Sequence, residues 1–445
     1  MKLYLFIGCV WMLCSCEKYL DVKPDRSLVV PMTLFDLEAL LNNSDQMNSA
    51  YAVIQESATD NAYLESTRWK NLTSLTAKNC YIWDDDLFND SERNEWSYSY
   101  VRINYCNLIL DRLAENKEAS NKKELIRGEA LFFRAMSFYQ LVDLFAKPFD
   151  KNTAATDLGI PLRLTSDINE KFTRASVQAC YDRIIDDLKE TLPILPTVSV
   201  HKSRPSRTAT YALLARLFLN MQRYEEAKTM TDSCLYYADQ LMDYKNISPG
   251  TATSFPLVRY NDEVIFHSTS FGRPSLNVTN GRVDMELVNS YKPNDLRKHL
   301  FLRSQGSLYS FRGSYDGSSV LFTGLSTNEI YLIKAECEVR LGNNQKGLEI
   351  LNHLLQFRYD STFVPYADLD SGQLLNIILQ ERRKELVFRG LRWSDLRRLN
   401  KDPRFAKVIT RELDGAVYKL EPNSGKYVLP IPTAVIVNTG IEQNR

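Results

Sequence analysis

Apolar residues recur at every third or fourth position along several long segments of the chain, which is the spacing of one face of an α-helix. One such segment runs from Trp96 to Leu113, and another, richer in aromatic residues, runs from Leu125 to Phe145. Pro148 follows the second segment, at a place where a proline commonly marks the end of a helix. The pattern predicts a mainly α-helical fold with long amphipathic helices.

Two further segments each predict a pair of helices about as long as one tetratricopeptide repeat, which is roughly 34 residues. They span Ser206–Ala238 and Thr327–Phe357. When the two are superposed, Ala215 falls on Ala335 and Ala227 falls on Gly347, so small residues recur where paired helices must approach closely. Stacked helix pairs of this kind form a superhelical scaffold with a surface for partners.

The stretch between these pairs, about residues 244–326, has a different character because glycine and proline punctuate it closely. Runs rich in β-branched and aromatic residues, such as Glu263–Thr269 and Val320–Phe322, predict a few short β-strands. A loop-rich insertion on a helical scaffold is a common place for binding residues. We therefore expect a single domain over residues 16–445, in which a helical scaffold carries this insertion.

The most highly charged stretch is Glu381–Leu399, with the sequence ERRKELVFRGLRWSDLRRL. Glu381 and Glu385 lie one helical turn apart among six arginines, and nearby positive charge lowers the pKa of a carboxyl group. A general acid needs the opposite shift, so the pair predicts a structural ion network rather than a catalytic dyad. Gly390 is placed to end the helix in a left-handed conformation, and Trp393 is interpreted as a core anchor.

Composition and motifs argue against nucleic-acid binding, metal binding and common kinds of catalysis. Lys and Arg number 55, as do Asp and Glu, so the chain has no basic excess for nucleic acid. The four histidines lie far apart, and no nucleophile-elbow, zinc-protease or phosphate-loop motif is present. We expect no catalytic residue, no metal and no cofactor. A hydrolase, the enzymatic alternative, would need a pair of carboxylates free of arginine.

The first residues predict a secretory signal. Lys2 precedes the apolar run Leu3–Leu13, which is too short to cross a membrane as a helix. The residues that follow, Leu13-Cys14-Ser15-Cys16, resemble a bacterial lipobox, in which the last cysteine receives a diacylglycerol. We expect residues 1–15 to be a lipoprotein signal peptide and Cys16 to anchor the mature chain in membrane lipid. No later segment has the roughly 18 consecutive apolar residues of a spanning helix.

Several aromatic residues lie where no helical stripe accounts for them. Trp69, Tyr81 and Trp83 fall in a polar stretch in which the periodicity fades. An aromatic ring in such a stretch either packs in the core or stacks on a flat, weakly charged ligand. Tyr260 and Arg273 fall in the insertion. We treat these five as candidate ligand contacts, with core packing as the alternative for each.

Segments across the chain together resemble one family. Gly128–Phe149, Glu381–Leu399 and the closing Tyr427–Pro432 are similar to signature segments of the SusD/RagB family, the nutrient-binding lipoproteins of Bacteroidetes outer membranes. The resemblance implies a SusD-like fold on a tetratricopeptide-type scaffold. It also implies that the ligand site is formed by loops of the N-terminal half together with the insertion.

The resemblance further implies a function without covalent chemistry. Such a lipoprotein captures a nutrient, usually an oligosaccharide, outside the outer membrane and acts as a lid on a SusC-like TonB-dependent transporter. Relatives of RagB type take peptides, and that alternative stays open for this chain. A purely structural tetratricopeptide-type lipoprotein, which binds a protein partner and no small ligand, is the other alternative.

Overall fold

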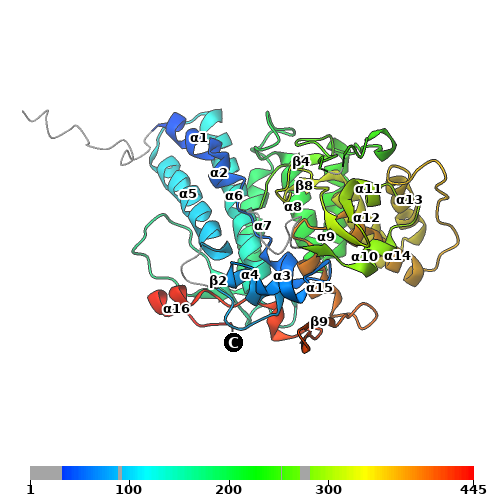
Figure 1. Ribbon diagram of the computed structural model, residues 1–445. Coiled ribbons are helices and arrows are strands. Elements are labelled where there is room, and N and C mark those ends of the chain that lie inside the picture. Colours follow the sequence, from blue (N-terminus) through cyan, green and yellow to red (C-terminus); the bar gives the residue numbers. More distant parts are fainter. Residues whose placement is uncertain (1–32, 89–92, 252, 271–280, 445) are drawn as a thin grey trace, which may run out of the picture.

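The computed structural model describes residues 33–444 except 89–92, 252 and 271–280. The predicted signal peptide, Cys16 and Arg273 lie outside the described residues. The described chain is mainly helical, as the periodicity predicted, and its strands form two-stranded antiparallel pairs. The two long helices over residues 95–145 stand side by side in one half of the molecule, and the insertion lies in the other half together with the second helix pair (Figure 1).

The helices are α1 (Leu34–Asn42), α2 (Ser44–Met47), α3 (Ser66–Lys70), α4 (Leu75–Tyr81), α5 (Glu95–Glu115), α6 (Asn121–Phe145), α7 (Val177–Thr191), α8 (Arg207–Asn220), α9 (Tyr224–Tyr237), α10 (Met285–Ser290), α11 (Arg297–Phe301), α12 (Thr327–Arg340), α13 (Asn344–Leu355), α14 (Ser371–Glu385), α15 (Arg392–Leu399) and α16 (Thr433–Thr439), with short 3-10 helices at Ile54–Ala58 (η3), Tyr244–Asn246 (η4) and Gly425–Tyr427 (η5). The strand pairs are β1 (Ala62–Tyr63) with β5 (Arg282–Val283), β2 (Leu158–Pro161) with β3 (Arg174–Ser176), β4 (Val264–Phe266) with β8 (Leu325–Ser326), β6 (Leu302–Gln305) with β7 (Leu308–Phe311), and β9 (Ile409–Leu413) with β10 (Ala416–Leu420).

Both long predicted helices are present, as α5 and α6, and the two predicted helix pairs are α8–α9 and α12–α13. Three of these helices begin where a side-chain oxygen takes up a free backbone N–H group. Asn94 and Ser97 form a capping box at the start of α5, while Ser120 and Ser206 cap α6 and α8. The starts of these three helices therefore follow from local sequence.

Gly347 shows why small residues recur in the helix pairs. A Cβ atom added to Gly347 on α13 would lie 2.5 Å from Cγ2 of Val339 and 3.1 Å from the carbonyl oxygen of Ala335, both on α12. Real Cβ atoms do not come so close, so any larger residue would force the two helices apart. The predicted small-residue contact within this pair is confirmed.

The insertion contains the short strands β4 to β8, but only one of the two runs predicted as strands is among them. Glu263–Thr269 contains β4, which pairs with β8. Val320–Phe322 is not a strand; Phe322 makes a single isolated bridge to Thr269. The reason is that the Ser314 hydroxyl donates to Val320 O (2.5 Å) and accepts from Phe322 N (3.1 Å), which occupies backbone groups that a ladder would need.

Arg297 lies at one centre of a charge network that is buried between α14 and the insertion. Its guanidinium group donates to Asp295 (2.7 and 2.8 Å), Glu381 (2.6 Å) and Glu385 (3.0 Å). Lys384 adds ion pairs to Asp295 (3.2 Å) and Glu381 (2.5 Å). All five side chains are buried, so each charge is balanced by partners rather than by water.

Arg358 is the second centre of this network. It donates to Glu385 (2.8 Å) and to Glu263 (2.6 Å), and the Tyr315 hydroxyl donates to the same Glu263 carboxylate (2.6 Å). Burial opposes the ionisation of Glu385, but the guanidinium groups of Arg358 and Arg297 outweigh it and lower the pKa of Glu385 to about 2. The predicted structural ion network is confirmed, and the glutamate pair is part of it.

The segment after α14 differs from the prediction in one respect. The helix ends at Glu385, and Gly390 lies beyond it rather than at its end. Gly390 adopts a φ of 77°, and a Cβ atom there would lie 3.2 Å from the Ala52 carbonyl oxygen. Its left-handed conformation therefore allows a close contact with the N-terminal segment.

Trp393 is fully buried against Tyr427, as the core-anchor interpretation predicted.

Glu385→Gln removes the negative charge that two buried guanidinium groups share. We expect the free energy of unfolding to fall by about 3–5 kcal/mol, because breaking a buried ion pair leaves an uncompensated charge. Urea denaturation followed by circular dichroism measures this loss. Glu349→Gln, on the exposed face of α13, is the matched control and should leave the urea midpoint unchanged. An unchanged midpoint in Glu385→Gln would contradict the role of the network.

Glu56, in η3, is a buried carboxyl group with the opposite pKa shift. It accepts hydrogen bonds from Gly390 N (2.7 Å) and from Asn61 Nδ2 (3.3 Å). Burial is the largest influence and raises the pKa of Glu56 to about 7, although these hydrogen bonds and the charge of Arg392 oppose it. The protonated form of Glu56 is therefore the one that the fold stabilises.

This shift predicts how stability depends on pH. The stability that protonated Glu56 contributes is fully present below its ordinary pKa of 4.5 and is lost as the pH rises through about 7. Glu56→Gln should remove that loss, so its stability relative to the parent should increase on the order of 3 kcal/mol between pH 4.5 and 8. Urea denaturation of both proteins over this range measures the difference. A difference that stays constant with pH would rule out the raised pKa.

Candidate functional site

Tyr81 and Trp83, two of the predicted ligand contacts, lie together in the core. The guanidinium carbon of Arg411 lies 3.6 Å from the centroid of the Tyr81 ring and 5.0 Å from that of Trp83. Trp83 Nε1 donates to Ala58 O (3.0 Å), and the Tyr81 hydroxyl accepts from Leu64 N (2.7 Å). Both rings are buried, so they pack on Arg411 and offer no face to solvent in this structure.

Trp69, on α3, is partly buried. Its Nε1 donates to Lys78 O (3.1 Å), and its ring packs against a small apolar cluster that includes Leu72 and Leu413. This cluster joins α3 and α4 to the β9–β10 hairpin. Trp69 thus helps to close a contact within the fold, and a ligand contact at this residue stays a prediction.

A polar cavity of about 300 Å³, the Asp60 cavity, lies beside these aromatic residues, where β1, α10 and β9 meet. Asp60 accepts from Arg392 (2.7 and 2.9 Å) and pairs with Lys407 (3.0 Å) and Arg383 (3.3 Å). Burial raises the pKa of Asp60, but Arg392 and Arg383 outweigh it and hold that pKa well below its usual range. Glu286 pairs with the same Lys407 and Arg383. The carboxylates of Asp60 and Glu286 are therefore paired with basic side chains of the fold.

A second cavity, of about 480 Å³, lies where the helix-pair scaffold meets the insertion, and we call it the Tyr260 pocket. Its walls are residues 197–202, the end of α9 with residues 238–240, and the segment that leads into β4. The Tyr260 ring lies edge-on to His201 (4.6 Å between centroids) and to His267 (4.7 Å). Tyr237 adds a second ring that is 43% exposed. Aromatic surface is therefore open to a ligand here.

The backbone of Tyr260 is strained, with a φ of 60°. Such a conformation costs a bulky residue on the order of 1–3 kcal/mol and persists only where the surroundings fix it. The neighbouring Asn261 provides this support. Its backbone oxygen accepts from Val264 N (3.0 Å) and Lys202 Nζ (2.6 Å), and its side-chain oxygen accepts from Glu263 N (3.2 Å). The ring of Tyr260 is thus held in place before any ligand arrives.

Three polar side chains of the Tyr260 pocket have no hydrogen-bond partner, in contrast to Asp60 and Glu286 of the Asp60 cavity. Asp239, Gln240 and Asp262 are exposed, and within the described part of the chain no hydrogen bond or ion pair involves their side-chain atoms. Carboxylates accept hydrogen bonds, and an amide both donates and accepts them. Beside exposed aromatic rings, these groups suit a ligand that carries hydroxyl groups around an apolar C–H face.

Glu263 fixes two walls of the Tyr260 pocket. Its carboxylate accepts from Met242 N (2.9 Å). Met242 comes just after residues 238–240, which form one wall, and Glu263 comes just after Tyr260 and Asp262, which form another. The same carboxylate accepts from Arg358 and Tyr315 of the buried network. The shape of the pocket is therefore coupled to the charges on α14.

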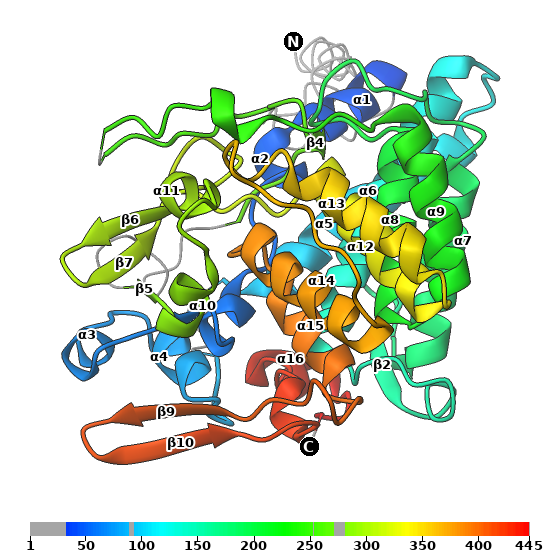
Figure 2. The same ribbon diagram turned by 90° about the vertical axis from the view of Figure 1, so that its right-hand side faces the viewer.

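The structure does not bring the predicted ligand residues into one site. β4, next to Tyr260, lies in the upper part of both views, whereas α3 and α4, which carry Trp69 and Tyr81, lie in the lower half (Figure 1, Figure 2). Sequence reasoning missed His201, Tyr237 and the free polar groups. The sequence did carry one indication that Tyr237 is exposed. Tyr237 is the last residue of the second helix of a predicted pair, beyond the apolar positions that are buried.

The described residues offer no metal site. Among residues 33–444, without 89–92, 252 and 271–280, no cluster of three or more His, Cys, Asp or Glu side chains is placed to hold a metal ion. No helix in that same described part is both long and apolar enough to cross a membrane.

Comparison with known families gives two matches. A SusD-like family model, described as starch-binding and associating with the outer membrane, matches residues 18–219. A second model, described as the SusD family, matches residues 327–445. The first range contains Gly128–Phe149, and the second contains Glu381–Leu399 and Tyr427–Pro432. The matches flank the insertion on both sides.

Individual proteins that are similar to this chain are also SusD-like. The SusD-like protein P2 of Formosa agariphila is 22% identical over 366 residues, which cover 68% of this chain and 71% of that protein. A SusD superfamily structure from Bacteroides vulgatus is 23% identical, with a TM-score of 0.75, and covers 93% of this chain and 98% of its own. A laminarin-binding SusD-like protein is 17% identical, with a TM-score of 0.66, and covers 92% and 97%. The structural likeness shows a SusD-like fold.

Proposed function

The chain belongs to the SusD/RagB family, and from this premise we propose that it captures a glycan at the cell surface and delivers it to a SusC-like TonB-dependent transporter. The description of the matching family as starch-binding and associated with the outer membrane supports carbohydrate capture. The laminarin-binding neighbour supports the same class of ligand.

The observation that carries this proposal is the Tyr260 pocket. Its volume lies within the roughly 300–1,000 Å³ of small-molecule sites. An oligosaccharide offers apolar ring faces to Tyr260 and Tyr237, and hydroxyl groups to Asp239, Gln240 and Asp262. Because the rings are held in place and the polar groups have no internal partners to give up, the cost of binding is low.

The proposal includes a lipid anchor and a transporter as the partner. Cys16 carries the lipid that holds the mature chain on the outer membrane, facing outward. The transporter is the partner that receives the ligand, with this chain as its lid. Bound glycan favours the closed state of the lid because it makes more contacts in that state than in the open one. No covalent step is required of the chain.

Calorimetric titration of the full chain in detergent tests the capture of a glycan. The probes are malto- and laminari-oligosaccharides and a panel of short peptides. We expect an oligosaccharide to bind, and we expect Tyr260→Ala to weaken that binding about tenfold, because a stacked ring contributes roughly 0.5–1.5 kcal/mol beyond its buried area. Asp262→Asn should weaken it as well, since the amide loses the charge that strengthens hydrogen bonds from hydroxyl groups.

Phe35→Ala is the control for this experiment. Phe35 lies on α1, is 72% exposed and does not line the pocket. Unchanged binding in Tyr260→Ala, or an equal loss in Phe35→Ala, would exclude the Tyr260 pocket as the site. Binding of peptides alone would favour the peptide-capturing alternative. Binding of neither class would favour a structural lipoprotein without a small ligand.

A further inference from the structure

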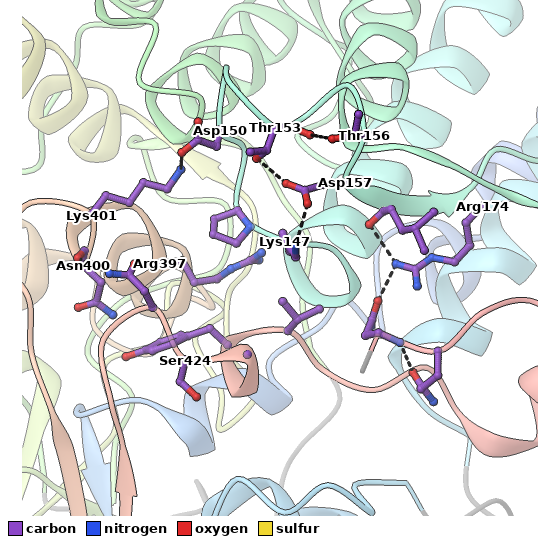
Figure 3. A pocket seen from close by; sticks show the side chains of 18 of the residues that line it. Lys147, Asp150, Thr153, Thr156, Asp157, Arg174, Arg397, Asn400, Lys401 and Ser424 are labelled. Atoms are coloured by element: carbon purple, nitrogen blue, oxygen red, sulfur yellow. Dashed lines mark hydrogen bonds and ion pairs between the residues drawn. The ribbon is translucent and has the colours of Figure 1, made fainter.

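A third cavity, of about 500 Å³, lies near the C-terminus, and its charged side chains already bind other groups of the fold. Figure 3 shows Lys147 directed at Asp157 and Lys401 directed at Asp150, and these ion pairs measure 2.7 and 3.3 Å. Arg174 donates to four oxygen atoms of the fold. This cavity therefore leaves no charge for a ligand to balance.

The Tyr260 pocket differs because its carboxylates are unpaired. Asp239 and Asp262 are exposed in its lining, and neither side chain forms an ion pair or a hydrogen bond in the described structure. Lys202 is the one lysine or arginine among its described lining residues, and its ammonium group donates to Asn261 O (2.6 Å). Burial lowers the pKa of Lys202, and the charge of Asp262 opposes that shift. Since Lys202 offsets at most one of the two carboxylates, the pocket keeps a negative charge.

Backbone contacts fix the places of both carboxylates. The backbone oxygen of Asp239 accepts from the hydroxyl of Tyr331 on α12 (3.0 Å). Asp262 lies between Asn261 and Glu263, which are both buried and are joined by a hydrogen bond from Glu263 N to Asn261 Oδ1 (3.2 Å). Because fixed segments present the two acidic groups, a ligand meets them without first having to order the chain.

A buried hydroxyl group in the same lining also lacks a partner. Thr327, the first residue of α12, is only 1% exposed, and no hydrogen bond involves its hydroxyl within the part of the chain that the structure describes. Its backbone N donates to Glu263 O (2.9 Å), which fixes its position. Because nearly all buried polar groups in folded proteins are paired, this hydroxyl points to a ligand that supplies the missing partner.

Carboxylates beside aromatic rings favour a cationic group. An ammonium group has three N–H donors, and its hydrogen bonds to carboxylates are stronger than those of a neutral hydroxyl. The faces of Tyr260 and Tyr237 attract the same positive charge. A carboxylate or sulfate on the ligand would instead be repelled by Asp239 and Asp262. The pocket therefore discriminates between glycans by their charge.

We propose that the Tyr260 pocket selects amino sugars, glycan units that carry a free, protonated amine, over neutral and acidic units. This inference rests on the proposed capture of glycans. Asp239 and Asp262 accept hydrogen bonds from the ammonium groups, and the C–H faces of the sugar rings stack on Tyr260. A sugar fits better than a lysine side chain, because Gln240 and Thr327 add neutral partners for hydroxyl groups.

Titration calorimetry of the full chain in detergent tests this proposal with β-1,4-linked trisaccharides of glucosamine, N-acetylglucosamine and glucose. These probes share one backbone and differ only at C2, which carries an ammonium, an acetamide or a hydroxyl group. At about pH 6, where the amine and the aspartates are charged, we expect the glucosamine trisaccharide to bind about tenfold more tightly than either of the others. Added salt should reduce this preference, because the carboxylates are exposed.

Variants assign the preference to the two carboxylates. Asp239→Asn and Asp262→Asn should each reduce it, and the double substitution should abolish it. Tyr260→Ala should weaken the binding of all the trisaccharides alike, because it removes the stacked ring and leaves the charges. Asp182→Asn is the matched control and should keep the preference, since Asp182 is exposed on α7 and does not line the pocket.

The outcomes separate this inference from the capture of glycans. Equal affinity for the three trisaccharides, still weakened by Tyr260→Ala, would overturn the selection of amino sugars and leave glycan capture intact. No binding of any oligosaccharide would overturn both. A preference that survives the double substitution, or that Asp182→Asn also removes, would overturn the role of the two carboxylates. A lysine tripeptide that binds as tightly as the glucosamine trisaccharide would overturn the selection of a sugar.

Discussion

The fold depends on charged side chains that can be buried only because each is paired with an opposite charge. Arg297 and Arg358 are completely buried, and both bind the carboxylate of Glu385 on α14. A buried ion pair is tolerated only with its partners in place, and removal of one partner costs far more than the pair contributes. Arg297, Asp295 and Glu263 belong to the insertion, whereas their partners Glu381, Glu385 and Arg358 belong to the scaffold. The insertion therefore has a single position against the scaffold, the one that completes the network.

The same constraint shapes the Tyr260 pocket. Glu263 balances Arg358 and at the same time holds the Met242 amide, so a residue that stabilises the fold also sets the walls of the pocket. The Asp60 cavity shows the contrast. Its acidic groups satisfy arginines and a lysine of the fold, whereas Asp239 and Asp262 have no such partners among the described residues. Acidic residues line both cavities, and the difference lies in what each carboxylate already binds.

Sequence reasoning succeeded where the signal is local. The helices follow from apolar spacing, the contact at Gly347 from small residues, and the ion network from two glutamates among arginines. Tyr260 was among the predicted candidates, but the sequence could not show which candidate rings are exposed, because distant segments decide exposure. Tyr81 and Trp83 are covered by Arg411, which comes far later in the chain, and no local pattern shows this. The left-handed conformation of Tyr260 likewise depends on the bonds of Asn261 to Lys202 and Val264.

The buried network thus positions the walls of the Tyr260 pocket. Amide hydrogen exchange of Glu263→Gln beside the parent protein tests it most directly, because the substitution keeps the size of the side chain and removes its charge. The account predicts faster exchange at Met242 and through the segment that leads into β4, with α5, α6 and α7 unchanged. Unchanged exchange at those amides, or an equal rise across the scaffold helices, would contradict it.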